Sequence, residues 1–284
     1  MSSIHIIAET RVDHRGMDDA LRALGAPDWH TDYTNSAELL AEFAGRLCYK
    51  SFAPGLNPNV TKVREGNAQY LGNILSQKHG SVFEHATTSV LFIGVSRILT
   101  HELVRHRPGT AYSQESQRYV RLDKFEVYIP DLTEAFNEIA KATENTPEWA
   151  QEQQGKFVQI VDMFSKFGEE HIKGLIFQYM LDDKRVSFHA KKQITSALRR
   201  LLPGGVNTNI LVTCNHRTWR HILANRTSVG AEQEIRENMF KLAQMFSERY
   251  PNIYQDMRFE PIRDEHGHVA PGAISEVIFA NEKV

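Results

Sequence analysis

One stretch of the chain, from Arg105 to Tyr119, constrains the fold more than any other. The residues before it, 96–106, place apolar side chains at helical spacing and predict a helix. Pro108 disfavours helical backbone at the preceding residue, so the helix is expected to stop at His106 and to be followed by a turn. The stretch holds three arginines, two serines and two tyrosines around a Pro-Gly break, and it is expected to wrap around a ligand.

These side chains suit a phosphorylated, planar ligand. Guanidinium groups present fixed forks of donors to phosphate oxygens, hydroxyls add short hydrogen bonds, and aromatic rings stack on a base or a flavin. On a continuous helix Arg105 and Arg107 would point roughly 200° apart, so they are expected to serve different groups of the ligand. The alternative is a charged helix end followed by a turn, since the helix dipole favours an arginine there.

Motifs elsewhere in the chain support the ligand hypothesis. The stretch resembles the signature of flavin-dependent thymidylate synthases, in which Arg-His-Arg is followed by seven or eight residues and a serine; here eight separate Arg107 from Ser116. The segments 80–85, 215–217 and 225–226 are also similar to that family, and the resemblance covers residues 40 to 250 or so.

The resemblance implies reductive methylation of dUMP to dTMP, with 5,10-methylenetetrahydrofolate as carbon donor and NADPH-reduced FAD as hydride donor. It also implies a homotetramer that shares its FAD sites between subunits. Neither the folate nor NADPH has a separate motif in this chain. No Gly-x-Gly-x-x-Gly sequence follows a predicted strand, so FAD would be held by other means.

The FAD-binding positions of the family carry over to eight residues of this chain. These are Ser81, Arg105, His106, Arg107, Gln114, Asn215, Arg217 and His221. Independently of the resemblance, Asn215 is a good helix N-cap, and Arg217 and His221 share one helix face, while Trp219, Ile222 and Leu223 can face the core. A helix N-terminus of this kind suits a phosphate, although an ordinary amphipathic helix would show the same spacing.

The nucleotide-binding positions of the family carry over in the same way. They correspond to Glu102, Leu103, Val104, Arg105, Gln114, Glu115, Ser116, Gln117, Arg118, Arg199 and Arg226. Arg226 is the catalytic residue that the resemblance implies, since its family counterpart is assigned the ionisation of the uracil ring at N3. An arginine remains protonated in proteins and can stabilise a developing ring anion without losing its charge.

The composition and net charge of the chain limit the kinds of partner that it can bind. Lys and Arg total 33 against 35 acidic residues, and a formal net charge of -2 provides no global field for DNA or RNA. The N-terminal residues do not read as a signal peptide, and no stretch reaches the ~18 apolar residues of a membrane span. We therefore expect a cytoplasmic protein that binds neither nucleic acid nor membrane.

The pattern of elements predicts an α+β fold. Strands are expected at 4–8, 87–95, 125–129 and 209–213, and helices at 37–49, 61–79, 96–106, 216 onward and 230–250. In the helix 37–49, the side chains of Leu39, Leu40, Phe43 and Leu47 should face inward. We expect a single domain, 1–284, with a central, mostly antiparallel sheet flanked by long helices. It has a helical insertion at about 131–202, a core at about 40–250 and a C-terminal tail at about 251–284.

Metal and thiol chemistry are not expected. His101 and His106 are five residues apart, whereas two metal-binding histidines on one helix face are typically four apart. Cys48 reads as a buried small hydrophobe, while Cys214 at a strand end is either reactive or simply packed. With a flavin to supply hydride, the family chemistry needs no protein nucleophile.

Three departures from the family pattern leave alternatives open. Gly230 stands where several members have histidine, Glu115 replaces an apolar residue, and the loop after Arg107 has the longer spacing. One alternative is a related flavin enzyme that methylates or hydroxymethylates another pyrimidine nucleotide. Another, from a different class, is a non-catalytic nucleotide- or RNA-binding protein built from the arginines and aromatics.

Overall fold

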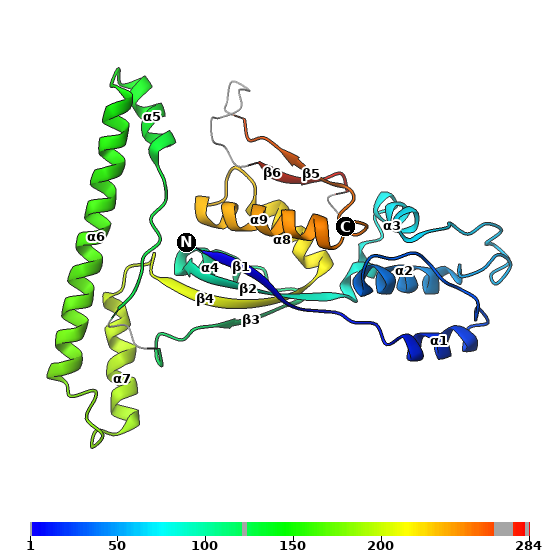
Figure 1. The fold of residues 1–284 in the computed structure, drawn as a ribbon, viewed down its shortest axis with the longest axis horizontal. Coiled ribbons are helices and arrows are strands. Elements are labelled where there is room, and N and C mark those ends of the chain that lie inside the picture. Colours follow the sequence, from blue (N-terminus) through cyan, green and yellow to red (C-terminus); the bar gives the residue numbers. More distant parts are fainter. Residues whose placement is uncertain (1, 121–123, 264–274, 282–283) are drawn as a thin grey trace. The chain divides into compact units, whose positions relative to one another are not determined.

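The computed structural model describes residues 2–120, 124–263, 275–281 and 284 (Figure 1). The chain forms two compact units. Unit 1 comprises Met1–Ser3, Phe92–Glu102 and Ser113–Ile210, and unit 2 comprises Ile4–Leu91, Leu103–Tyr112 and Leu211–Val284. Helices and strands occur in both units, so the predicted α+β class is confirmed. The single domain stays a prediction.

A four-stranded sheet has the order β1-β2-β4-β3. Its strands are β1 (Ser3–Glu9), β2 (Thr87–Ser96), β3 (Thr110–Gln114) and β4 (Asn207–Asn215). The hydroxyls of Ser89 and Thr213 lie 2.8 Å apart, and further along β2 the Arg97 N–H donates to the Val206 carbonyl. Between these two contacts the residue number rises along β2 and falls along β4, so the two strands are antiparallel. The sheet is antiparallel, as predicted.

Side chains along β4 alternate between buried and partly exposed positions. Thr208, Ile210, Val212 and Cys214 are buried, and the residues between them are partly exposed, as expected for side chains that point to opposite faces in turn. The strands predicted at 4–8, 87–95 and 209–213 are confirmed.

The strand predicted at 125–129 was wrong. Only an isolated bridge joins Val127 to Val206 there. Pro130 has no N–H to donate, so a ladder of hydrogen bonds cannot continue past this point. β3, which the sequence patterns did not predict, pairs with β4 instead.

Unit 2 contains a core of packed helices and a two-stranded sheet. Its helices are α1 (His14–Ala23), α2 (Ser36–Tyr49), α3 (Asn67–Ser76), the 3-10 turn η1 (Gly80–Glu84), α8 (His216–Arg226) and α9 (Gln233–Arg249), and β5 (Met257–Glu260) pairs antiparallel with β6 (Glu276–Phe279). As predicted, Trp219, Ile222 and Leu223 of α8 are fully buried. The Trp219 indole N–H donates to the Thr88 carbonyl at 3.1 Å, which fastens α8 to β2 (Figure 1).

The buried face of α2 differs from the prediction. Leu39 is buried as expected, but Leu47 is 45% exposed and Cys48 is exposed. The core instead receives the charged residues Glu42 and Arg46, which form an ion pair of 2.6 Å. Arg46 also donates to two backbone carbonyls, so the charges are compensated and the buried face is rotated away from Leu47.

Unit 1 contains the predicted helical insertion. The helices of unit 1 are α4 (Arg97–Leu103), which precedes the insertion, and α5 (Thr133–Ala142), α6 (Pro147–Gln178), α7 (Phe188–Leu198) and the 3-10 turn η2 (Arg199–Leu201), which lie within it. Pro147 occupies the first turn of α6 after the Thr146 cap, and α5 packs on α6 with the Phe136 and Trp149 rings 6.3 Å apart (Figure 1). In the described part of the chain, the helices are all too short or too polar to cross a bilayer.

Three helices begin or end at other residues than predicted. α3 begins at Asn67 rather than at 61, after Gly66 with a φ of 80°. α9 begins at Gln233 rather than at 230, because the Glu232 carboxylate caps its first N–H groups. α4 ends at Leu103 rather than at His106, for reasons that lie in the loop that follows it.

A buried histidine links α8 to the sheet and to the C-terminal part of unit 2. His216 is fully buried, with Nδ1 3.1 Å from the Tyr254 hydroxyl and Nε2 3.3 Å from the Thr88 hydroxyl. Burial lowers the pKa of His216 to about 3, so the ring is neutral at neutral pH.

This histidine should make unfolding depend on pH. In the unfolded chain His216 is protonated below its usual pKa of about 6.5, whereas in the folded protein the ring stays neutral down to about pH 3. The free energy of unfolding should therefore fall as the pH falls between these two values, by up to ~1.4 kcal/mol per pH unit. We expect His216→Gln to reduce this slope between pH 6 and 5 in urea titrations, and the exposed control His30→Gln to retain it. Equal slopes for all three proteins would contradict the assignment.

Candidate functional site

The arginine-rich loop is held as a turn by side chains of β3. After Leu103 the chain runs through 104–109 into β3. The Tyr112 hydroxyl lies 2.9 Å from the Leu103 carbonyl oxygen and 2.6 Å from that of His106, and the Thr110 hydroxyl donates to the His106 carbonyl at 2.8 Å. These hydroxyls take the places that further helical N–H groups would occupy, which is why α4 stops at Leu103.

Gly109 lets this loop sit on the N-terminus of α8. Its φ of 67° lies in the left-handed region, and an added Cβ would lie 2.6 Å from Asn215 Nδ2. The Thr218 hydroxyl donates to the Pro108 carbonyl at 2.9 Å, and the Asn215 side chain caps α8 by accepting the Thr218 N–H at 2.8 Å. The predicted cap is therefore confirmed, and it lies directly against the loop.

Gly109→Ala should separate the loop from α8. The strained backbone and the contact with Asn215 together are expected to lower the free energy of unfolding by about 1–3 kcal/mol. The control is Gly155→Ala in α6, where an added Cβ meets nothing within 4 Å, and which should gain about 0.5–1 kcal/mol. Denaturant titrations of both variants check this, and an unchanged or raised stability for Gly109→Ala would refute it.

The loop, η1 and α8 line a cavity of about 690 Å³ within unit 2. Its lining residues are Glu84, Arg105, His106, Pro108, Gly109, Asn215, Arg217, Thr218, His221 and Val284. Five of the eight predicted FAD residues, namely Arg105, His106, Asn215, Arg217 and His221, come together here. Thus the structure gathers two segments more than a hundred residues apart around one space.

The cavity carries positive charge. Arg105 and Arg107 are exposed, and neither forms an ion pair with another described residue. Arg107 belongs to the same loop but does not line the cavity. Arg217 is paired with the Glu84 carboxylate, so Arg105 and the N-terminus of α8 leave an attraction for an anion.

His106 and Arg226 form a contact that fixes the protonation of the histidine. Arg226 Nε donates to His106 Nε2 at 2.8 Å, and because the guanidinium is always protonated, His106 must accept through Nε2. Burial, together with the charge of Arg226 and the nearby His221, lowers the pKa of His106 to about 4. The ring is therefore neutral at pH 7 and holds the guanidinium of the predicted catalytic residue.

A second cavity of about 350 Å³ in unit 2 contains the predicted residue Ser81. It is lined by Gly45, Cys48, Tyr49, Ile74, Lys78, His79, Gly80, Ser81, Val82 and Arg217. Arg217 lines both cavities, so the cavity that contains Ser81 shares this side chain with the cavity of the five other predicted FAD residues. Cys48, which the sequence predicted to be buried, is exposed at this wall.

The other predicted nucleotide residues divide between the units. Leu103 and Val104 lie in unit 2 with Arg105 and Arg226, and Leu103 is fully buried. Unit 1 contains the remaining seven residues: Glu102, Gln114, Glu115, Ser116, Gln117, Arg118 and Arg199. In unit 1 the Gln114 amide donates to the Thr100 hydroxyl at 3.0 Å, which ties the end of β3 to α4.

Glu115, a departure from the family pattern, has a structural role. Its carboxylate accepts from Asn209 Nδ2 at 2.7 Å, and its carbonyl accepts from the Arg97 guanidinium at 2.6 Å. Arg199 is exposed nearby, and its charge adds to burial in lowering the pKa of Arg97. Two guanidinium groups thus lie close enough in unit 1 to repel each other, an arrangement that an anion would relieve.

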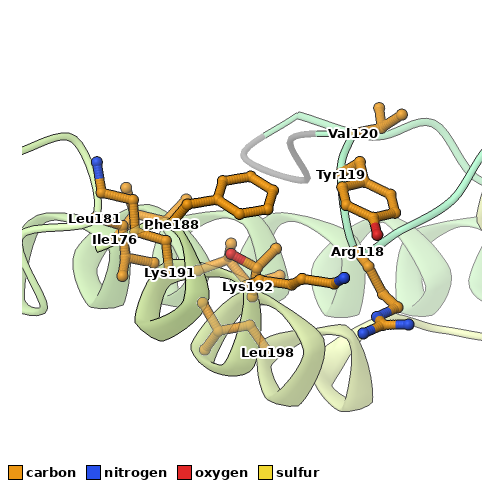
Figure 2. A pocket seen from close by; sticks show the side chains of 11 residues that line it. Arg118, Tyr119, Val120, Ile176, Leu181, Phe188, Lys191, Lys192 and Leu198 are labelled. Atoms are coloured by element: carbon orange, nitrogen blue, oxygen red, sulfur yellow. The ribbon is translucent and has the colours of Figure 1, made fainter. Parts of the chain in front are cut away.

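Arg118 borders a smaller cavity of about 190 Å³ within unit 1 (Figure 2). Its Nε donates to the Ser196 hydroxyl at 3.2 Å, and its backbone N–H donates to the Ser116 hydroxyl. Tyr119 lies beside Arg118, and the Lys192 ammonium is 5.0 Å from the centre of its ring. The lining of this cavity combines apolar side chains with the basic residues Arg118, Lys191 and Lys192, which add to the positive charge around Arg118.

The thiols and histidines show no sign of a reactive or metal site in the described residues. Cys214 is buried, and burial raises the pKa of its thiol, so of the two open alternatives the structure supports packing. No group of three or more His, Cys, Asp or Glu side chains is placed to hold a metal ion within the ranges that the structure describes.

Sequence reasoning missed three residues of the site. Thr218 follows the predicted cap and was detectable as a hydroxyl in the first turn of a helix. Glu84 lies in a segment that resembles the family, but its pairing with Arg217, 133 positions away, has no local signal. Tyr112 was counted among the aromatic side chains for stacking, whereas its hydroxyl fastens the loop.

Comparison with known proteins identifies the family of this chain. Residues 31–252 match the family described as thymidylate synthase complementing protein. A flavin-dependent thymidylate synthase of Corynebacterium glutamicum is 33% identical over 237 residues, which cover 84% of this chain and 86% of the relative. The one from Mycobacterium sp. (strain KMS) is 35% identical over 238 residues, which cover 83% and 85%.

A third relative extends the match. The flavin-dependent thymidylate synthase of Corynebacterium aurimucosum is 32% identical over 249 residues, which cover 86% of this chain and 91% of the relative. The matched residues include the loop, β3, β4 and α8, which carry the predicted site. The chain belongs to the thymidylate synthase complementing protein family.

Proposed function

We propose that this protein is a flavin-dependent thymidylate synthase, a methyltransferase that converts dUMP to dTMP. It would take the carbon from 5,10-methylenetetrahydrofolate and the hydride from FAD reduced by NADPH. The names of the relatives support this proposal. The observation that carries it is the group of Arg105, His106, Asn215, Arg217 and His221 around one cavity, from two distant parts of the chain.

The side chains around this cavity fit FAD. A diphosphate needs cations and N–H donors, which Arg105 and the N-terminus of α8 provide, and the Asn215 cap fixes that N-terminus. Ser81, Arg107 and Gln114 would complete the set that the resemblance implies. Bound FAD, once reduced, supplies the hydride for the pyrimidine ring.

Arg226 would stabilise the uracil ring of dUMP as it loses its proton at N3. His106, being neutral, accepts a hydrogen bond from Arg226 without repelling it, and this contact limits the positions that the guanidinium can take. A guanidinium that is already oriented stabilises a developing anion without reorganisation during the reaction.

The remaining nucleotide residues would hold the phosphate and the sugar. In unit 1, Arg118 and Arg199 provide charge, and Ser116 provides a hydroxyl, while Glu102, Gln114, Glu115 and Gln117 would contribute polar contacts. In unit 2, Leu103 is buried and would only shape the site, with Val104 beside it and Arg105 shared with FAD. We further propose a cytoplasmic homotetramer that shares its FAD sites between subunits.

The reaction can be tested directly. Purified protein is incubated with FAD, NADPH and 5,10-methylenetetrahydrofolate, and loss of the hydrogen at ring carbon 5 is followed with dUMP, UMP or dCMP. Loss of this hydrogen and formation of dTMP with dUMP alone would support the proposal. Turnover of UMP or dCMP instead would show that the substrate is another nucleotide. Absence of release with all three, together with RNA binding that weakens steeply with salt, would favour the non-catalytic alternative.

A further inference from the structure

α6 has two apolar faces, of which only one is covered within unit 1. Ala150, Gly168 and Ile172 are buried on the first face, and the helices α5 and α7 pack there (Figure 1). The second face consists of Ile160, Met163, Phe164 and Phe167, whose side chains are 50 to 61% exposed. We call these four residues the α6 stripe.

The spacing of the α6 stripe is that of a helix-packing seam. At about 100° per residue the four side chains fall within an arc of roughly 100°, which borders the buried face, since Phe164 lies roughly 40° from Gly168. Between them they expose apolar surface on the order of 400 Å², since a large side chain presents up to about 200 Å². A contiguous patch of this size is often functional.

Charges beside the α6 stripe indicate which partner fits. Lys156, which also forms an exposed ion pair with Glu152 at 2.7 Å, and Glu170 lie seven residues before and after Met163, on the same flank of the stripe. If a second α6 packed in parallel, Lys156 would face Lys156 and Glu170 would face Glu170. If it packed antiparallel about Met163, each lysine would face a glutamate, as flanking charges do in specific helix pairs.

We propose that two copies of this chain associate through the α6 stripe as an antiparallel pair, with Met163 near the two-fold axis. Both the centre of the apolar residues, between Ile160 and Phe167, and the centre of the flanking charges fall at or beside Met163. A two-fold contact requires such self-complementarity, because the same surface serves as both partners. Both copies together would bury about 800 Å² of the stripe, and flanking side chains bring this into the range of ~1,200 Å² for a specific interface.

Disulfide trapping tests the position of the axis. In a Cys48→Ser background, which removes the exposed thiol, Met163→Cys should form a disulfide between copies under mild oxidation, since residues at a two-fold axis approach within ~7 Å. The control is Asp162→Cys, an exposed position on the opposite side of the helix. We expect cross-linking at 163 to be roughly tenfold faster, and equal rates or no product at 163 would overturn the proposal.

Mass in solution tests the interface itself. Phe164→Glu combined with Phe167→Glu should halve the mass measured by light scattering while the circular dichroism spectrum is retained, and Lys166→Glu, on the charged face, should leave the mass unchanged. Lys156→Glu should weaken association, and adding Glu170→Lys should restore it. A monomeric unaltered protein, or an unchanged mass for the double glutamate variant, would refute the proposal whether or not the protein proves to be a synthase.

Discussion

Arg226→Ala should lower kcat about a thousandfold, with FAD still bound and the fold intact. A cation about 4 Å from a developing ring anion, at an effective dielectric near 20, contributes at most ~4 kcal/mol, which corresponds to roughly three orders of magnitude in rate. The side chain is only half-buried, so its removal should cost far less stability than activity. Steady-state kinetics of dTMP formation and thermal unfolding, measured on the same preparation, provide the comparison.

Two further variants separate charge from orientation. Arg226→Lys retains the charge but cannot reproduce the Nε contact with His106, so its kcat should lie between those of the unaltered protein and Arg226→Ala. His106→Phe removes only the acceptor and should lower kcat less than Arg226→Ala does. If Arg226→Ala turned over at the normal rate, Arg226 would have no catalytic role, even if the protein proved to be a synthase.

Arg220→Met should strongly destabilise the protein. The Arg220 side chain is 1% exposed and makes two hydrogen bonds to Asp256, at 2.7 and 2.9 Å, and a third to the Ile253 carbonyl at 3.0 Å. Its guanidinium carbon also lies 4.1 Å from the centre of the Phe279 ring. Removing it leaves the carboxylate of Asp256 buried without a partner cation, which typically costs about 3–5 kcal/mol.

Exposed pairs provide the control for this prediction. Arg22→Met breaks an ion pair with Asp19 whose two side chains are both more than 60% exposed, and it should change the free energy of unfolding by less than about 1 kcal/mol. Adding Asp256→Asn to Arg220→Met should recover part of the loss, because no charge is then buried. Similar midpoints of denaturation for Arg22→Met and Arg220→Met would contradict this account.

Local patterns were enough to predict two of the elements that carry the site, β4 and α8. The strand-forming residues at 209–213 identified β4, residue type identified the Asn215 cap, and helical spacing placed Trp219 in the core of unit 2. The resemblance, in turn, selected Arg105 and His221, which line the same cavity. The predictions of β4, the Asn215 cap and the buried Trp219 depend only on neighbours within one or two helical turns or along one strand.

Errors arose where charge was buried by a distant partner. Sequence spacing placed Leu47 in the core because charged residues usually face solvent, but Glu42 and Arg46 neutralise each other and take that place. Likewise Arg217 and Arg220 look alike in the sequence. One is partly exposed and lines two cavities, and the other is buried against a carboxylate 36 positions away. No local pattern encodes that difference.

Arg217 lines both of the cavities described in unit 2 and also forms an ion pair with Glu84. A molecule that draws this guanidinium toward one cavity therefore alters the charge presented to the other. Thermodynamic linkage requires the effect to be mutual, so whatever factor the first occupant imposes on the affinity of the second, the second imposes on the first. Occupancy of the Ser81 side and of the His221 side should accordingly be negatively cooperative, with Arg217 as the residue whose replacement makes them independent.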